Sequence, residues 1–182
     1  MRKFVVGIDE AGRGPLAGPL SVGVVAVPRG FDWSLIEGVG DSKQVSKKNR
    51  EAIFLRAQTL KKDGKLDYAV SLISPNVIDK QGITKCVSIG IKRSLTRLSI
   101  SPKHSEVKLD GLLRAPEEYV IQETIEGGDA KEKVIGLASI LAKVTRDRHM
   151  TRLALKHPVY AFEQHKGYGT KLHRSLILKH GI

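Results

Sequence analysis

The sequence predicts a mixed α/β domain in which one central sheet is flanked by helices. Apolar runs of strand length are interspersed with longer segments whose apolar residues recur at helical spacing. Their order is strands, helix, strand, helices, strands and helices, which is typical of a mixed sheet. A length of 182 residues fits one ordinary domain, so we expect a single domain over residues 1–182.

The first half of the chain begins with two strands, expected at residues 4–9 and 21–27. Glycines and prolines break any regular element between them, and no helix fits there, so we expect an antiparallel hairpin. Ser46 can cap a helix that runs to about residue 62. A strand over 66–73 follows, and Ser74-Pro75 is a good start for a short helix that leads to Gly82.

The second half is expected to be mainly helical. A helix over about residues 83–98 precedes strands at 106–110 and 118–125, and Gly127-Gly128-Asp129 breaks the second strand. The longest helix, about 132–156, stops before Pro158, because the residue before a proline disfavours helical geometry. A loop rich in His, Lys, Gly and Tyr covers 158–170, and a final helix covers about 170–180.

The charge balance is the first functional observation. Lys and Arg number 31 against 19 Asp and Glu, which gives a net charge of +12. This excess favours a polyanionic partner, although a merely basic surface is the alternative. No apolar run is long enough to span a membrane, and the N-terminus does not resemble a signal peptide. Cys86, the single cysteine, excludes an internal disulfide and is expected to be structural, so we expect a cytoplasmic setting.

Asp9-Glu10 is the first candidate site, where a predicted strand meets a glycine-rich turn. Two adjacent carboxylates repel each other and are costly to bury without a cation. Mg²⁺ and Mn²⁺ prefer such oxygen ligands. Neighbours on an ideal strand point to opposite faces, so both can bind one site only if the strand bends, which the glycines allow. A solvated acidic turn is the alternative interpretation of the pair alone.

The segment from Gly12 to Ala17 also fits a loose dinucleotide-binding pattern, G-x-G-x-x-[GA]. That pattern must open a helix behind the strand, whereas a proline and another strand follow here. Two upstream carboxylates would also repel a pyrophosphate. We therefore reject dinucleotide binding and interpret the glycines as bare backbone that a ligand can approach closely.

Ser139, Lys143 and Asp147 are spaced four residues apart on the longest predicted helix, so they share one face. A hydroxyl, a cation and a carboxylate in a row suit phosphate and metal contact. An ordinary salt-bridged surface row is the alternative. Asp110 lies at a predicted strand end before Gly111, where by itself it is a turn residue.

Tyr168 lies between two glycines in the loop HKGYGT at 165–170. An exposed ring beside lysines suits stacking on sugars or bases and contact with phosphate. A tyrosine packed as a loop anchor is an equal alternative. The six histidines show no metal-ligand spacing, so a structural zinc site is not expected.

Together, five segments resemble the ribonuclease HII family, the type 2 ribonucleases H. The segments are GIDEAGRGPLAGP at 7–19, DSK at 41–43, LDG at 109–111, ASILAKVTRDR at 138–148 and HKGYGT at 165–170. Their order and approximate spacing fit over nearly the whole chain. The resemblance implies a ribonuclease H-like fold, a central mixed sheet flanked by helices. It also implies that the C-terminal helices, about residues 132–182, pack beside the active-site cleft.

The resemblance also carries site residues over by position. It implies four catalytic, metal-binding carboxylates: Asp9, Glu10, Asp110 and Asp147. Gly12, Arg13 and Gly14 match the loop whose backbone senses the ribose 2′-hydroxyl, and Tyr168 matches the tyrosine that packs on the following sugar. Four further positions match phosphate contacts: Ser42, Lys43, Ser139 and Lys143. The implied cofactor is a divalent metal, Mg²⁺ or Mn²⁺.

The implied reaction is hydrolysis of the RNA strand of RNA–DNA hybrids and of single ribonucleotides embedded in duplex DNA. The cut falls 5′ of the ribonucleotide and leaves a 3′-hydroxyl and a 5′-phosphate. Two-metal catalysis needs no protein nucleophile. The expected partners are these nucleic acids and no membrane, and we expect a monomer. The alternatives are a non-catalytic nucleic-acid-binding module and another nuclease on the same fold.

Overall fold

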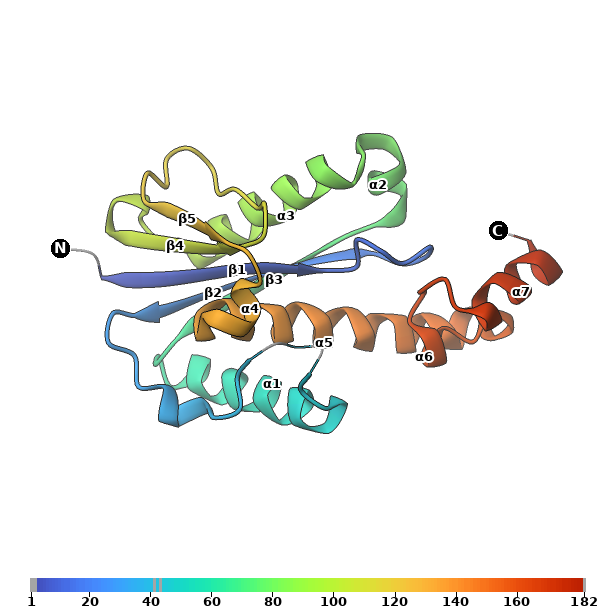
Figure 1. Ribbon diagram of the computed structural model, residues 1–182, viewed down its shortest axis with the longest axis horizontal. Helices are drawn as coiled ribbons and strands as arrows, with labels where there is room; N and C mark the ends of the chain where they lie inside the picture. The colour runs from blue at the N-terminus through green and yellow to red at the C-terminus, as the bar shows by residue number, and fades with distance from the viewer. Residues whose placement is uncertain (1–2, 41, 43, 182) are drawn as a thin grey trace.

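One five-stranded mixed sheet forms the centre of the molecule (Figure 1). The computed structural model describes residues 3–40, 42 and 44–181. The strands are β1 (Phe4–Ala11), β2 (Leu20–Pro28), β3 (Asp67–Ile73), β4 (Ser105–Asp110) and β5 (Gln122–Ile125), in the order β3-β2-β1-β4-β5. β2 pairs antiparallel with β1 and β3, whereas β4 pairs parallel with β1 and β5. The predicted mixed sheet and N-terminal hairpin are confirmed.

Helices cover both faces of this sheet (Figure 1). One face packs on α3 (Ile83–Leu98), which follows the short α2 (Pro75–Gln81), and its core includes Ile8 and Ile91. The other face packs on α1 (Lys47–Lys62) and α5 (Lys133–Lys156), and its core includes Val25 and Leu141. Burial of both faces explains why β2 reads as a nearly continuous apolar run.

Two glycines let α5 lie directly on the backbone of the hairpin. A Cβ at Gly7 would be 2.2 Å from the carbonyl oxygen of Val134, and a Cβ at Gly23 would be 2.4 Å from that of Ala138. No side chain fits at either place, so the helix sits closer to β1 and β2 than larger residues would permit. This close approach brings the residues that follow Ala138 toward the ends of the strands.

The second half of α5 runs past the sheet to the C-terminal elements α6 (Phe162–His165) and α7 (Lys171–His180), as Figure 1 shows. A small separate core joins α5 to α6 and is built on Met150, Ala154 and Phe162. Among the described residues, no helix is both long and apolar enough to cross a membrane.

Several boundaries differ from the sequence-based expectation. A short helix, α4 (Gly128–Lys131), forms where the two glycines were expected only to break the chain. A Cβ at Gly128 would lie 2.7 Å from Ile135 Cδ1, so the lack of a side chain lets Ile135 of α5 pack closely against α4. β5 begins at Gln122 because the preceding residues turn, with Tyr119 N–H donating to Pro116 O. Short helices also form at Trp33–Ile36, Pro102–His104 and Pro158–Tyr160.

Cys86 belongs to α3, and its thiol is buried in the core that this helix forms with the sheet, as expected for a structural residue. Its Sγ lies 3.5 Å from the carbonyl oxygen of Val77.

Candidate functional site

A pocket of about 220 Å³ opens where β1 and β4 end beside α5, and we call it the acidic pocket. Its lining combines carboxylates, small residues, a tyrosine and two cations. The lining residues are Asp9, Glu10, Ala11, Gly12, Arg13, Ser42, Asp110, Asp129, Ser139, Lys143 and Tyr168. Segments far apart in the sequence therefore meet here, and most of them are the segments that the sequence singled out.

The end of the β1–β4 ladder explains how Asp9 and Glu10 reach one pocket. The last pair of that ladder is Ile8 with Leu109, so both carboxylates lie beyond it. The strand continues past both carboxylates, beyond its expected end at residue 9, because β1 stays paired with β2 through Ala11. Neighbouring side chains on a strand point to opposite faces of the sheet. Beyond Ile8, however, β4 no longer pairs with β1, and both carboxylates line the pocket at this unpaired edge of β1.

Asp110 ends β4 and is fixed by a backbone contact. Its Oδ1 accepts a hydrogen bond from the N–H of Gly128 at 2.7 Å. This bond ties β4 to α4, and α4 carries Asp129, which is 8% exposed and lines the same pocket. From the sequence alone, Asp129 is expected only to be part of a break in the chain. An acidic residue between a strand and the longest helix was the available signal.

Burial perturbs the carboxylates of this pocket. It raises the pKa of Asp9 to about 8, the charges of Glu10 and Asp110 add to the rise, and the Ser139 hydroxyl opposes it. Burial also raises the pKa of Glu10, against the opposing effect of Arg13. Glu10 Oε2 is buried and has no hydrogen-bond partner among the described residues. Both shifts and the unpartnered oxygen are features that a bound cation would relieve.

The carboxylates are not arranged as a finished metal site. Over residues 3–40, 42 and 44–181, no group of three His, Cys, Asp or Glu side chains is placed to hold a metal ion. Their oxygens are partly engaged elsewhere: Asp9 Oδ1 accepts the Glu10 N–H at 2.7 Å, and Glu10 Oε1 lies 3.4 Å from Arg13. The donor chemistry nevertheless fits a hard divalent cation, since the buried Glu10 oxygen and its acidic neighbours are the ligands such ions prefer.

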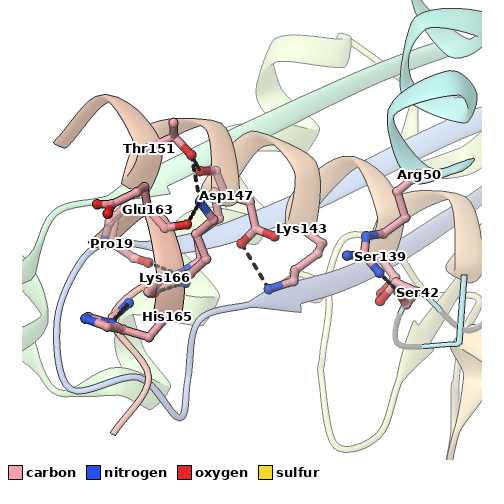
Figure 2. A network of polar contacts seen from close by, with 12 residues as sticks. Pro19, Ser42, Arg50, Ser139, Lys143, Asp147, Thr151, Glu163, His165 and Lys166 are labelled. Carbon is pink, nitrogen blue, oxygen red and sulfur yellow. Dashed lines mark hydrogen bonds and ion pairs between the residues drawn. The ribbon is translucent and has the colours of Figure 1, made fainter. Parts of the chain in front are cut away.

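The three polar residues that share one face of α5 line two different pockets. The Ser139 hydroxyl donates to Ser42 Oγ at 2.8 Å, and Lys143 Nζ lies 2.9 Å from Asp147 Oδ1, as Figure 2 shows. Ser139 and Lys143 line the acidic pocket, whereas Asp147 lines a neighbouring pocket of about 520 Å³ with Lys47, Glu51, Arg148, Thr151, Arg152 and Lys166. The structure thus brings three of the four predicted carboxylates together and places Asp147 outside their pocket. Lys43 lies outside the described residues.

The glycine loop and Tyr168 form the remaining wall. Gly12 has a φ of +106°, and a Cβ there would lie 2.4 Å from Arg146 Nε, so only glycine fits. Gly14 lies just beyond the lining, in open space. Tyr168 is 39% exposed, and Lys143 Nζ lies 5.2 Å from the centroid of its ring. The ring is therefore accessible and held beside a cation.

Comparison with known proteins shows which family the sequence and the fold match. The family model described as Ribonuclease HII matches residues 6–182. A ribonuclease HII of Endomicrobium trichonymphae is 46% identical over 178 residues, which cover 98% of this chain and 80% of that protein. Ribonuclease H2 of Pyrococcus horikoshii OT3 superposes with a TM-score of 0.72 at 28% identity, covering 97% of this chain and 85% of that one. The ribonuclease HII of the PCNA complex from Archaeoglobus fulgidus gives 0.75 at 25% identity, with 97% and 87% covered.

Proposed function

We infer that this chain, which belongs to the ribonuclease HII family, cuts the RNA strand of RNA–DNA hybrids and single ribonucleotides embedded in duplex DNA. Family membership itself makes the protein a ribonuclease H, a hydrolase with endonuclease activity. A non-catalytic nucleic-acid-binding module is thereby excluded. The substrates, the polarity of the cut and the groups that perform it are our proposal.

The composition of the acidic pocket carries this proposal. Carboxylates, a close-packed glycine backbone and an accessible tyrosine line one cavity. Phosphodiester hydrolysis needs groups that stabilise developing negative charge, and carboxylate-bound cations supply them. Discrimination of RNA from DNA needs a group that reads the 2′-hydroxyl, for which the backbone of Gly12, Arg13 and Gly14 is suited. An exposed ring such as that of Tyr168 can pack on the adjacent sugar.

We propose that Asp9, Glu10, Asp110 and Asp129 hold the divalent cations, Mg²⁺ or Mn²⁺. When bound, two such cations activate a water and stabilise the leaving oxygen. Asp129 takes the place that the resemblance gave to Asp147, because it lines the pocket of the other three. The role left to Asp147 is to position Lys143, with which it forms a salt bridge at 2.9 Å.

The other side chains of the pocket bind and orient the substrate. Lys143 presents a cation beside Tyr168 and is suited to a phosphate of the cut strand. Ser139 and Ser42 are joined by a hydrogen bond and offer hydroxyls on the same wall. We propose that the strand is cut 5′ of the ribonucleotide, which leaves a 3′-hydroxyl and a 5′-phosphate.

The test is a cleavage map. The protein is incubated with Mg²⁺ or Mn²⁺ and a DNA duplex that carries one ribonucleotide, and the ends of both fragments are identified. We expect one cut 5′ of the ribonucleotide, and no cut in the all-DNA duplex or without metal. A cut at another phosphate, or equal cutting of the all-DNA duplex, would refute the proposal and favour another nuclease on the same fold.

The assignment of the fourth carboxylate needs its own comparison. Asp129→Asn should lower kcat by two orders of magnitude or more, about the effect of losing one strong electrostatic group. It should also weaken the thermal stabilisation produced by Mn²⁺. Asp147→Asn should keep that stabilisation and lose activity mainly through the contact of Lys143 with phosphate. The reverse pattern would return the metal-binding role to Asp147.

A further inference from the structure

Arg146 is the most deeply buried charged side chain among the described residues, with no exposed surface. Its guanidinium donates to three main-chain carbonyl oxygens: Nε to Pro19 at 2.9 Å, Nη1 to Lys166 at 2.9 Å and Nη2 to Ala17 at 3.0 Å. Within the described part of the chain it forms no ion pair with a carboxylate. Three neutral acceptors therefore replace the water and the counter-ion that a buried guanidinium needs.

The three carbonyls belong to two loops that are distant in sequence. Ala17 and Pro19 follow the glycine loop, and Lys166 lies in the loop that carries Tyr168. These loops also meet directly, because the N–H groups of Leu16 and Ala17 both point at the carbonyl oxygen of Gly167, at 2.8 and 3.3 Å. A single side chain from α5 thus joins both loops to the helix.

The surrounding glycines show how closely this junction is packed. A Cβ at Gly12 would lie 2.4 Å from Arg146 Nε, and one at Gly18 would lie 3.3 Å from Arg146 Nη2. A Cβ at Gly167 would lie 2.2 Å from the carbonyl oxygen of Ala17. The Tyr168 ring centroid is 5.7 Å from Arg146 Cζ. The guanidinium therefore lies against both the backbone of the glycine loop and the ring beside the pocket.

We propose that Arg146 is a positioning residue that fixes the distance between the glycine loop and Tyr168, and so sets the selectivity for a ribonucleotide followed by DNA. This inference rests on the proposed function, in which the glycine loop reads the 2′-hydroxyl and Tyr168 packs on the next sugar. Both groups must contact adjacent nucleotides together. A shift of about 1 Å between them is enough to lower a rate by about 100-fold.

Three variants separate positioning from simple stability. Arg146→Lys keeps the charge, but one ammonium cannot reproduce the planar fork that reaches three carbonyls. Arg146→Met removes every donor and keeps much of the volume. Arg146→Ala leaves a space in which added guanidinium can bind. The matched control is Arg97→Met, because Arg97 donates to the carbonyl oxygen of Val70 on the opposite face of the sheet.

Two readouts are measured on the full chain. Amide hydrogen exchange over residues 12–18 and 166–169 should lose about tenfold or more of its protection in Arg146→Met, the effect expected for one charged hydrogen bond. The kcat/KM for one embedded ribonucleotide should fall much more than that for a long hybrid, about tenfold more. Arg146→Lys should show the same directions, and guanidinium should restore the substrate ratio in Arg146→Ala. Arg97→Met should change neither quantity.

Unchanged exchange in both loops, or an equal fall in kcat/KM for both substrates, would overturn the proposal. If Arg146→Met fails to fold, the proposal is tested by the same two readouts on Arg146→Lys and on Arg146→Ala with added guanidinium. If the unaltered protein cuts neither substrate, the proposed function fails. The exchange data then decide by themselves whether Arg146 holds the two loops.

Discussion

Replacing Asp9 with asparagine should make the metal-free protein more stable at neutral pH, although it removes a proposed ligand. Burial raises the pKa of this carboxyl from 3.8 to about 8. The unfolded chain gives up the proton near the lower value, whereas the folded chain keeps it until the higher one. Stability that is fully present below the lower pKa is therefore lost as the pH rises toward about 8. At pH 7 this loss is at most about 4 kcal/mol.

Asparagine removes the charge and keeps the oxygen that accepts the Glu10 N–H at 2.7 Å. In EDTA at neutral pH, thermal unfolding should show a Tm several degrees higher for Asp9→Asn, since 1 kcal/mol corresponds to about 2–4 °C in a chain of this size. The gain should shrink as the pH falls toward 3.8 and disappear well below it, where the carboxyl is protonated in both states. Asp79→Asn, on the exposed side of α2, should stay within about 0.5 kcal/mol of the unaltered protein.

A Tm of Asp9→Asn equal to or below that of the unaltered protein in EDTA would refute this reasoning. A gain of the same size at both pH values would also refute it, because the effect would then not come from ionisation. Saturating Mg²⁺ should remove most of this difference in stability. The metal binds only the folded state of the unaltered protein well, which is worth about 2.7 kcal/mol at a hundredfold excess over Kd.

Three further outcomes follow from the structure. Gly7→Ala should lower the free energy of unfolding by about 1–3 kcal/mol, because its methyl would lie 2.2 Å from Val134 O; urea denaturation measures this, with Gly40→Ala, which faces open space, as control. Fluorescence anisotropy of Asp110→Asn on a hybrid duplex should show affinity falling steeply with salt, and a flat affinity would contradict a phosphate-tracking surface. Tyr168→Ala should reduce the preference for a single embedded ribonucleotide over a long hybrid in cleavage assays, whereas Tyr168→Phe should retain it.

Local patterns were enough to predict most elements of the fold. Periodicity placed α1 and α3 within a residue or two of their ends, because each helix buries one stripe and leaves the other faces in water. The hairpin of β1 and β2 followed from the lack of room for a helix between two short apolar runs. α4 was missed because a glycine pair usually ends an element, whereas here its lack of a Cβ admits Ile135.

The site shows the limit of reasoning from spacing alone. Ser139, Lys143 and Asp147 do share one face of α5, yet the pocket boundary passes between Lys143 and Asp147. Asp129 reaches the acidic pocket on α4, which the hydrogen bond from Gly128 N–H to Asp110 ties to β4. Arg146 could not be told from its neighbours on the helix, since its burial depends on carbonyl groups 127 and 129 residues away in the chain. Such features depend on tertiary contacts that helical periodicity does not encode.

Helix α5 has two different environments along its 24 residues. Its first half is clamped on β1 and β2, and its second half leaves the sheet and carries α6 and α7 with a small core of their own. The proposed catalytic residues lie near the border between these halves. Changes in the outlying half should therefore alter which duplexes are accepted while the packed core of the sheet stays intact. In an evolving lineage, this arrangement lets substrate preference diverge around a constant catalytic centre.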